Sequence, residues 1–482
     1  MTLKKASEKK SEIATTETSQ ARGPVTKLFG TDGIRGTANA FPMTPETVVR
    51  VGQAIGLMLR RRGRTSDSHS AKGPIKVVIG KDTRLSGYMI EQALSSGLNS
   101  MGIHVQLVGP LPTPGIGYLT RSMRADAGIV ISASHNAYID NGIKIFGPDG
   151  FKIPDQMERE IEGLVAAEDF VKHLPPSKDI GRTKRIEDAQ GRYIVHAKNS
   201  FPLEHTLDGL RMVLDTAHGA AYRVAKAIFE ELGAEVLHIG ADPNGTNINE
   251  EVGALFPLKT REAVLQYRAD VGISLDGDAD RLIMVDEKGE IMNGDHILGI
   301  CALFMKEKKI LKKNQLVVTH MSNFGLEKEM NANGIEVIKT NVGDKFVVEE
   351  MKKRELNLGG EQSGHIIFLD HTTTGDGCIA ALNVLALMRE TRQRMSELNA
   401  LIKDVPQVLI NCRVRNRVKL EDIPAYQRRL REIEDSLAGD GRVFVRFSGT
   451  EPVVRILVEG PDRTKILDHA EDLAQILERE LS

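Results

Sequence analysis

Short apolar runs alternate along most of the chain with polar segments that contain glycine or aspartate. In the first clear stretch the pattern predicts a strand at Ile75–Gly80, a loop at 81–87, a helix at Tyr88–Met101 and a strand at His104–Gly109. The same order recurs at 212–232 and again from Leu316 onward. Because short strands that alternate with helices are typical of parallel α/β units, the pattern predicts three related α/β domains.

The C-terminal part has a different pattern. Strand-like runs at 405–414 and 442–459, with polar helical stretches at 421–437 and 462–481, predict a smaller α+β domain. Polar stretches place the domain boundaries near 175–190, 280–290 and 395–405. We therefore expect a disordered N-terminal tail at 1–24, α/β domains at 25–180, 181–285 and 286–400, and a C-terminal domain at 401–482.

Composition excludes several classes of protein. A chain of 482 residues is too long for one core, and its net charge of −2, without a large basic block, argues against a nucleic-acid partner. Aromatic residues are scarce, and no apolar run is long enough to predict a membrane span. The three cysteines are far apart and the N-terminal segment lacks the apolar part of a secretory signal, so we expect a cytoplasmic protein.

Ser134 is the first candidate for chemistry. It lies in Ile131-Ser-Ala-Ser-His-Asn136, where an apolar run ends in a turn of small polar residues. Such a serine can simply cap the local backbone, or it can act as a nucleophile if a base, a metal or a positive charge activates it. His135 need not be that base, because neighbours in a strand point to opposite faces. Lys144 is a second candidate for handling the proton or stabilising charge, although a surface lysine is the simpler reading.

A second apolar run ends in Asp276-Gly-Asp-Ala-Asp-Arg281. An EF-hand begins in the same way, but Arg281 stands where the sharp turn needs glycine, and the flanking residues look like strands. Three carboxylates so close together repel one another unless a cation neutralises them. Asp276, Asp278 and Asp280 are therefore candidate ligands of Mg²⁺, which takes a few carboxylates and completes its shell with phosphate oxygens.

Three further segments carry weaker signals. Arg446 and Arg455 bracket a Ser-Gly-Thr turn that either binds a phosphate dianion or is an ordinary hairpin with surface arginines. Glu361 and Ser363 are two residues apart; on an extended segment they would present polar groups on one side, but the glycines around them also fit a turn. Phe29–Gly36, which contains Arg35, is glycine-rich but lacks the pattern of a P-loop.

Taken together and in this order, the segments closely resemble the α-D-phosphohexomutase superfamily from about residue 26 to the C-terminus. The matching segments are Phe29–Gly36, Ile131–Asn136, Asp276–Arg281, Gly360–His365 and Arg446–Arg455. The resemblance implies four domains around a central cleft, three of them α/β and one a smaller C-terminal α+β domain. It also implies a phosphosugar as the small-molecule partner and a homodimer through the first domain.

The resemblance also implies roles for individual residues. Ser134 is the residue that carries a phosphate in the active enzyme, and an oxygen of that phosphate joins Asp276, Asp278 and Asp280 around Mg²⁺. Arg35 and Arg281 face the transferring phosphoryl group, and Lys144 and His365 match positions of proton transfer. The sugar is bound by Glu361 and Ser363, with a contribution from Gly343–Lys345. The distal phosphate is bound by Arg446, Ser448, Gly449, Thr450 and Arg455.

The implied reaction is the reversible interconversion of glucosamine 6-phosphate and glucosamine 1-phosphate through a 1,6-bisphosphate, which supplies the synthesis of UDP-N-acetylglucosamine. Glucose or mannose phosphates remain alternatives, because no residue physically dictates an amine over a hydroxyl at C2. A non-catalytic phosphosugar-binding protein is a rival from another class, against which the intact Ser134 and the three aspartates argue. Ala137 stands where the family usually has proline, a change that would loosen the loop but removes no functional group.

Overall fold

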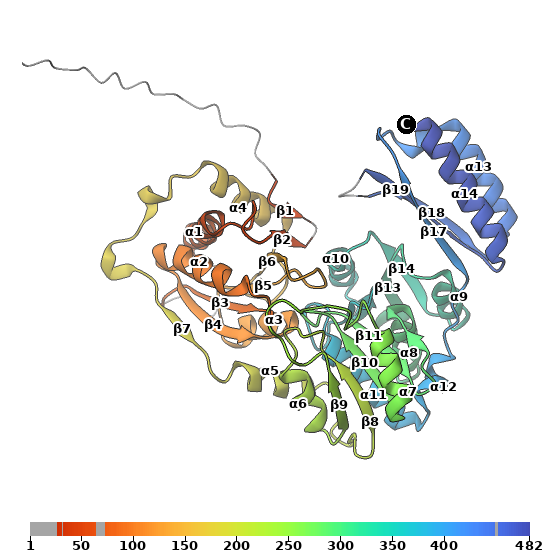
Figure 1. Cartoon of the computed structure of the whole chain (residues 1–482), viewed down its shortest axis with the longest axis horizontal. Coiled ribbons are helices and arrows are strands. Elements are labelled where there is room, and N and C mark those ends of the chain that lie inside the picture. Colours follow the sequence, from red (N-terminus) through yellow and green to blue (C-terminus); the bar gives the residue numbers. More distant parts are fainter. Residues whose placement is uncertain (1–26, 31, 64–72, 449–451) are drawn as a thin grey trace, which may run out of the picture.

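The computed structural model describes residues 27–30, 32–63, 73–448 and 452–482 (Figure 1). The tail predicted at 1–24, together with Gly449 and Thr450, lies outside these residues. Four sheets with helices packed on them follow one another along the chain, and the last is the smallest. The expected architecture of three α/β domains and a smaller C-terminal α+β domain is confirmed. No helix among the described residues is both long and apolar enough to cross a membrane.

The first sheet has seven strands in the order β1-β2-β6-β5-β3-β4-β7. Its strands are β1 (Phe29–Gly30), β2 (Gly33–Thr37), β3 (Lys76–Lys81), β4 (His104–Pro110), β5 (Ala127–Ile131), β6 (Asp140–Phe146) and β7 (Thr183–Arg185). The helices of this part are α1 (Pro45–Arg62), α2 (Gly87–Ser100), α3 (Thr113–Ser122) and α4 (Asp155–Ala167), with 3-10 turns at Phe170–His173 and Ser177–Asp179.

The second and third sheets have the orders β12-β11-β10-β8-β9 and β14-β13-β15-β16. The second contains β8 (Arg211–Asp215), β9 (Glu235–Ile239), β10 (Val271–Leu275), β11 (Leu282–Asp286) and β12 (Ile291–Met292), and its helices are α5 (Ala189–Lys198), α6 (Val224–Glu230) and α7 (Leu258–Tyr267). The third contains β13 (Gln315–Thr319), β14 (Glu336–Thr340), β15 (Leu358–Gly360) and β16 (Ile366–Phe368). Its helices are α8 (Gly294–Glu307), α9 (Phe324–Ala332), α10 (Asp344–Arg354), α11 (Gly377–Thr391) and α12 (Met395–Asn399), with a 3-10 turn at Lys312–Asn314.

The three sheets repeat one plan. Each has parallel strands at its centre, and the last of them is followed by an antiparallel partner: β5 by β6, β10 by β11 and β15 by β16. The loops inside these three pairs contain Ser134, the three aspartates and Glu361, respectively. The sequence therefore places its candidate residues at equivalent positions of three similar sheets.

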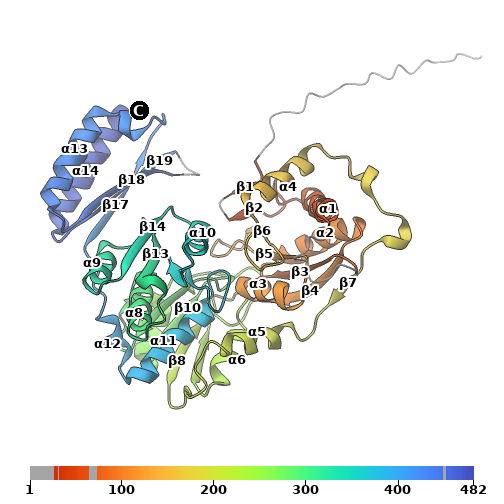
Figure 2. The same ribbon diagram turned by 180° about the vertical axis from the view of Figure 1, so that it is seen from behind.

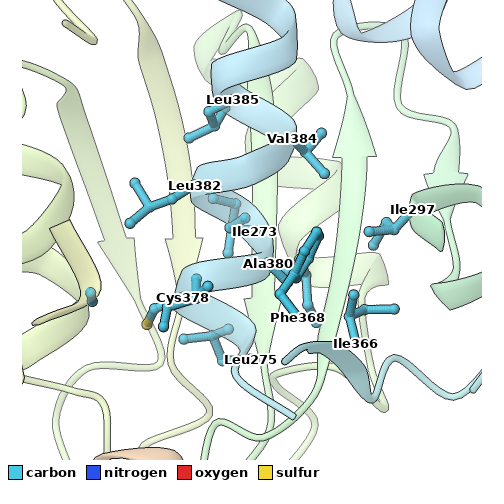
Figure 3. Packing of buried hydrophobic residues seen from close by; sticks show 14 of the residues in the cluster. Ile273, Leu275, Ile297, Ile366, Phe368, Cys378, Ala380, Leu382, Val384 and Leu385 are labelled. Atoms are coloured by element: carbon cyan, nitrogen blue, oxygen red, sulfur yellow. The ribbon is translucent and has the colours of Figure 1, made fainter. Parts of the chain in front are cut away.

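A continuous apolar core joins the second and third sheets to one face of the first. Helix α11 lies in the middle of it, and Figure 3 shows Cys378 and Leu382 on the side of Ile273 and Leu275 of β10, with Ala380 beside Phe368 of β16. The helix is apolar on nearly all sides because both sheets cover it. A second core fills the other face of the first sheet, under α1, α2 and α4. The first three domains are therefore held together by buried apolar surface.

The C-terminal domain has a core of its own. It consists of the sheet β17-β19-β18 with β17 (Gln407–Arg413), β18 (Arg442–Phe447) and β19 (Val453–Glu459), the helices α13 (Pro424–Leu437) and α14 (Arg463–Glu480), and a 3-10 turn at Leu420–Asp422. Polar contacts connect it to the start of α9: Arg442 donates to the carbonyl of Ser322, and Glu459 accepts from the backbone N–H of Phe324 at 3.0 Å. Both views show this domain next to α9 and apart from α1 and α2 (Figures 1 and 2).

Candidate active site

The loops that contain Ser134, the aspartates and Glu361 meet at one place. The backbone of Gly277 lies so close to the serine loop that a Cβ at this position would be 2.5 Å from the carbonyl oxygen of Ser134. On the other side, Arg281 forms an isolated antiparallel bridge with His365. The Asp loop is thus in contact with both other loops, and the candidate residues of three domains surround one site.

Ser134 is buried and has the left-handed backbone conformation, with φ at 52°. Its Oγ donates to Asp276 Oδ2 at 2.6 Å and lies 3.3 Å from Nδ1 of His135. The strand has ended before this point, so the rule that neighbours in a strand point to opposite faces does not apply to Ser134 and His135. Burial and the charges of Arg281 and Arg35 lower the pKa of His135 to about 4, which keeps its imidazole neutral.

Asp276, Asp278 and Asp280 are buried, and one carboxylate oxygen of each lies within 4.8 Å of the others. Burial, together with the neighbouring Asp280 and Asp278, raises the pKa of Asp276 to about 7. The Oδ1 of Asp278 is buried without a hydrogen-bond partner among the described residues. A bound cation would give the unpaired Oδ1 a partner and would favour ionisation of Asp276. These three residues therefore fit a divalent metal with oxygen ligands.

Lys144 is buried on β6, and the reading of it as a surface lysine is wrong. Its Nζ lies 3.0 Å from Asp278 Oδ2, 3.3 Å from Asp280 Oδ2 and 3.0 Å from Asp32 Oδ2. Although burial lowers the pKa of Lys144, these carboxylates raise it well above its usual value. Lys144 is therefore protonated and places a positive charge beside the Asp loop.

His365 and Glu361 form a chain of hydrogen bonds that ends at the Asp loop. His365 Nε2 lies 2.8 Å from Asp280 Oδ1, and its Nδ1 lies 3.0 Å from Glu361 Oε2. Burial lowers the pKa of His365, but Asp280 and Glu361 raise it to about 10, so the imidazole is protonated. The segment is not extended: Gly364 N–H donates to the carbonyl of Glu361 at 3.0 Å, which makes residues 361–364 the tight turn that was the alternative.

A line of alternating charges crosses from the first to the third domain. Arg35 donates to Asp32, whose Oδ1 lies 2.5 Å from Lys152, and Lys152 lies 2.7 Å from Asp344 Oδ2 at the start of α10. Lys345, the next residue, pairs with Asp155 of α4. In this structure Asp344 and Lys345 therefore connect domains, whereas the resemblance implies that their segment orients the sugar.

Arg446 and Arg455 stand directly opposite each other across β18 and β19. With Glu361 and Ser363 they line a cleft of about 780 Å³ between the third and C-terminal domains. Burial and the Arg455 charge lower the pKa of Arg446. The segment is a hairpin, but its arginines are partly buried and share one cleft, an arrangement that suits a dianion. Ser448 is buried beside them.

Four buried polar residues around Ser134 were not anticipated from the sequence. Thr113 donates to Asp278 Oδ2 at 2.7 Å, and Asp82 accepts from the hydroxyl of Ser132 at 2.6 Å. Arg84 and Asn249 lie behind the serine loop. Asp82 and Arg84 directly follow an apolar strand, as Asp276 does, and that position in the sequence could have indicated them. No feature of the sequence indicates Asn249, because only the fold brings it to the serine loop.

Comparison with known proteins covers nearly the whole chain. Residues 26–172, 191–289 and 293–405 match domains I, II and III of the family described as phosphoglucomutase/phosphomannomutase, and residues 409–476 match its C-terminal domain. The phosphoglucosamine mutase of Bdellovibrio bacteriovorus is 69% identical over 95% of this chain and 99% of its own length. Those of Pelobacter propionicus and Myxococcus xanthus are 53% and 52% identical, over 94% and 95% of this chain and 99% and 98% of their own lengths.

Solved structures share the fold. A phosphoglucomutase/phosphomannomutase family protein from Burkholderia thailandensis superposes with a TM-score of 0.77 at 22% identity, over 94% of this chain and 97% of its own. An N-acetylphosphoglucosamine mutase from Aspergillus fumigatus, solved with GlcNAc-6P and magnesium, has a TM-score of 0.60 at 18% identity, over 90% of this chain and 99% of its own.

Proposed function

Because the chain belongs to the phosphoglucomutase/phosphomannomutase family, we propose that it interconverts glucosamine 6-phosphate and glucosamine 1-phosphate. A phosphate carried on Ser134 is transferred to the free sugar hydroxyl, which gives a 1,6-bisphosphate. The intermediate reorients, and its other phosphate returns to Ser134. The choice of glucosamine follows the names of relatives that are 52 to 69% identical over nearly their whole length.

One observation carries this proposal. A serine hydroxyl, 1% exposed, lies 2.6 Å from a carboxylate of a buried aspartate triad, in a molecule whose neighbouring cleft is lined by two facing arginines. A nucleophile, a cation site and a separate anion site are the parts that phosphoryl transfer needs, because this chemistry depends mostly on positioning and charge neutralisation. A protein that only bound a phosphosugar would have no need of the buried serine and its triad.

We assign the metal site to Asp276, Asp278 and Asp280, with Mg²⁺ as the cation. When bound, Mg²⁺ neutralises charge on phosphoryl oxygens. The three aspartates would hold it from one loop, and Thr113 and Lys144 hold oxygens of Asp278 and Asp280 in place. Lys144 and Arg281 supply further positive charge on the same side, and the pKa of Arg281 is raised despite its burial because Asp276 and Asp280 are close.

The proton balance of each half-reaction is simple. In the first half-reaction the bond from Ser134 Oγ to phosphorus breaks, a bond from the sugar oxygen to phosphorus forms, and the proton of the sugar hydroxyl ends on Ser134 Oγ. In the second half-reaction Ser134 Oγ bonds to the other phosphate, the bond from that phosphorus to its sugar oxygen breaks, and the proton of Ser134 Oγ ends on the released sugar oxygen. His365 and Lys144, both kept protonated by carboxylates, are the groups that we propose as donors to leaving oxygens. Glu361 and Ser363 bind the sugar hydroxyls, and Arg446 and Arg455 bind the distal phosphate with Ser448, Gly449 and Thr450.

The test compares substrates and one variant. With a sugar 1,6-bisphosphate as activator, kcat/KM is measured on glucosamine, glucose and mannose 6-phosphates, and the first is expected to be highest. Mass spectrometry should locate one phosphate at Ser134, and Ser134→Ala should lose turnover while keeping its unfolding transition. A higher kcat/KM on mannose or glucose phosphate would overturn the sugar assignment, and substantial turnover by Ser134→Ala would overturn the phosphoserine.

Two further expectations belong to this proposal. The chain is expected to form homodimers, which sedimentation velocity measures directly. It is also expected to act in the cytoplasm, where the three cysteines, all free and buried in the structure, would stay reduced. Fractionation of cells that express the tagged chain tests that location.

A further inference from the structure

The serine loop has a backbone that needs external support. Ser134 is in the left-handed region, which residues with a side chain adopt at a cost, and no glycine relieves the turn between residues 132 and 139. The carbonyl groups of Ser134, Asn136, Ala137 and Asp140 all accept hydrogen bonds from one side chain outside the loop. The position of Ser134 Oγ therefore depends on that side chain.

The side chain is that of Arg84, which is 1% exposed. Its Nη2 donates to the carbonyls of Ser134 at 2.9 Å and Asn136 at 2.8 Å, and its Nη1 donates to those of Ala137 and Asp140 at 2.5 and 3.1 Å. Its Nε donates to Asp82 at 2.8 Å, so the buried charge is paired. Asp82 in turn accepts from Ser132 Oγ, which accepts from the backbone N–H of Ser134 at 2.8 Å. The guanidinium and its partner thus hold both the N–H and the carbonyl of Ser134.

Asn249 supports the same backbone from the second domain. Its Nδ2 donates to the carbonyl of Ser134 at 2.9 Å and to that of Asn136 at 3.1 Å, so it shares both acceptors with Arg84. Asn249 itself is anchored by its backbone N–H, which donates to the carbonyl of Ala217. Its Nδ2 also lies against Gly277 of the Asp loop, where an added Cβ would be 2.8 Å away. One amide therefore contacts both loops whose side chains meet at Ser134 Oγ and Asp276.

We propose that Arg84 and Asn249 are positioning residues that hold the Ser134 loop against the Asp loop from two domains. This inference rests on the proposed function, because it assigns them a task in transfer to and from Ser134. A loop that is phosphorylated and dephosphorylated in every turnover gains and loses a dianion at its tip, and it would relax if its backbone were free. Positional errors of about 1 Å can cost about 100-fold in rate, so fixed carbonyls have a kinetic consequence.

Lysine cannot replace Arg84 in this role. A guanidinium presents five N–H groups in a planar fork, and here all four carbonyls and the carboxylate lie around that fork. An ammonium group keeps the charge but has three donors at one point. Arg84→Lys therefore separates the geometry of the contact from its charge. Asn249→Gly removes the amide at a residue whose φ is 59°, where glycine adds no backbone strain.

Two control variants make the same substitutions away from the serine loop. Arg50 also donates to backbone carbonyls, those of Val165 at 2.7 Å and Glu168 at 3.1 Å, beside the core under α1 and α4 rather than the core shared with the other domains. Asn314 has a φ of 50° and is exposed at the start of β13. Arg50→Lys controls for the loss of a guanidinium that holds backbone carbonyls, and Asn314→Gly controls for a glycine at a left-handed position, where little change in stability is expected; both should leave kcat unchanged.

The experiment measures kcat and KM for glucosamine 6-phosphate, thermal unfolding, and the ³¹P resonance of the phosphoserine. Arg84→Lys and Asn249→Gly should each lower kcat by about 10- to 100-fold with KM nearly unchanged, because the loop does not contact the distal phosphate. The ³¹P resonance should shift or broaden in both. The kcat of the double variant should be little lower than that of the more impaired single variant, because both side chains act on the same two carbonyls.

The outcomes separate the two proposals. If the wild type is active and phosphorylated but both variants keep kcat within about twofold of their controls, Arg84 and Asn249 are structural only and this inference is wrong. If Arg84→Lys does not fold, Asn249→Gly alone decides. A wild type without phosphate on Ser134 and without mutase turnover would instead overturn the proposed function.

Discussion

Adding one methyl group at Gly277 should separate the two loops on which transfer depends. The new Cβ would lie 2.5 Å from the carbonyl oxygen of Ser134, 2.8 Å from Asn249 Nδ2 and 2.9 Å from Ile248 Cδ1. Ordinary contact begins at 3.4 Å, so the serine carbonyl must move by about 0.9 Å. The hydrogen bond from Ser134 Oγ to Asp276 Oδ2 is only 2.6 Å long, so a shift of this size would lengthen or break it.

The expected cost has two parts. Forcing a methyl group into a packed site lowers the free energy of unfolding by about 1–3 kcal/mol. Misplacing the nucleophile by about 1 Å lowers kcat by about 100-fold. Urea unfolding measures the first part, and kcat at saturating glucosamine 6-phosphate and bisphosphate measures the second.

Gly163 provides the matched control. It lies on the exposed side of α4, and a Cβ there meets no atom within 4 Å. Because alanine is preferred over glycine inside a helix by about 1 kcal/mol, Gly163→Ala should be slightly more stable than the wild type and equally active. If the kcat of Gly277→Ala were within about twofold of that of Gly163→Ala, the close contact between the loops would not control catalysis, and the reasoning would be refuted.

Three other predictions follow from single contacts. Thr113→Val, which removes the hydroxyl bound to Asp278, should weaken Mg²⁺ binding by about 10- to 100-fold in calorimetry, and unchanged affinity would contradict this support. Arg446→Met should raise KM by about 10- to 100-fold while mass spectrometry still finds phosphate on Ser134; an unchanged KM would exclude Arg446 from the phosphate site. Burial raises the pKa of Asp295 to about 7, so the folded state keeps a proton that the unfolded state loses, and stability should fall as the pH rises from about 4 to 7. In urea unfolding, the stability of Asp295→Asn relative to wild type should therefore be higher at pH 8 than at pH 5. The same difference between variant and wild type at both pH values would argue against the raised pKa.

The sequence predicted the fold and the central residues because both are encoded locally. An apolar run that stops at a polar turn marks the end of a strand, and both Ser134 and Asp276 follow such runs. That these turns meet could be inferred only from family resemblance, since they are 142 residues apart. The expected three related domains are explained by the common plan of the sheets, in which each candidate loop joins a parallel strand to an antiparallel one.

Residues whose environment is made by distant segments were not predictable. Lys144 looked like a surface residue because its own segment does not reveal that β6 is buried on both faces, nor that Asp278 lies opposite. Asn249 acts from another domain on the serine loop. For Glu361 and Ser363 the sequence left an extended segment and a glycine-rich turn as alternatives, and the turn is the one that formed.

The separate core of the C-terminal domain has a consequence for how such chains change over generations. Its buried residues are its own, whereas the apolar core around α11 passes through the other three domains without interruption. A crossover near residue 405 would therefore exchange the whole module and disturb few contacts of the described residues, among them those at Ser322–Phe324, the linker held by Asn323 and the ion pair of Lys328 with Asp440. A crossover inside either of the two middle domains would cut one shared interior. Recombination should therefore be able to supply a new C-terminal module, with the two arginines that we propose bind phosphate, to an otherwise unchanged body of three domains.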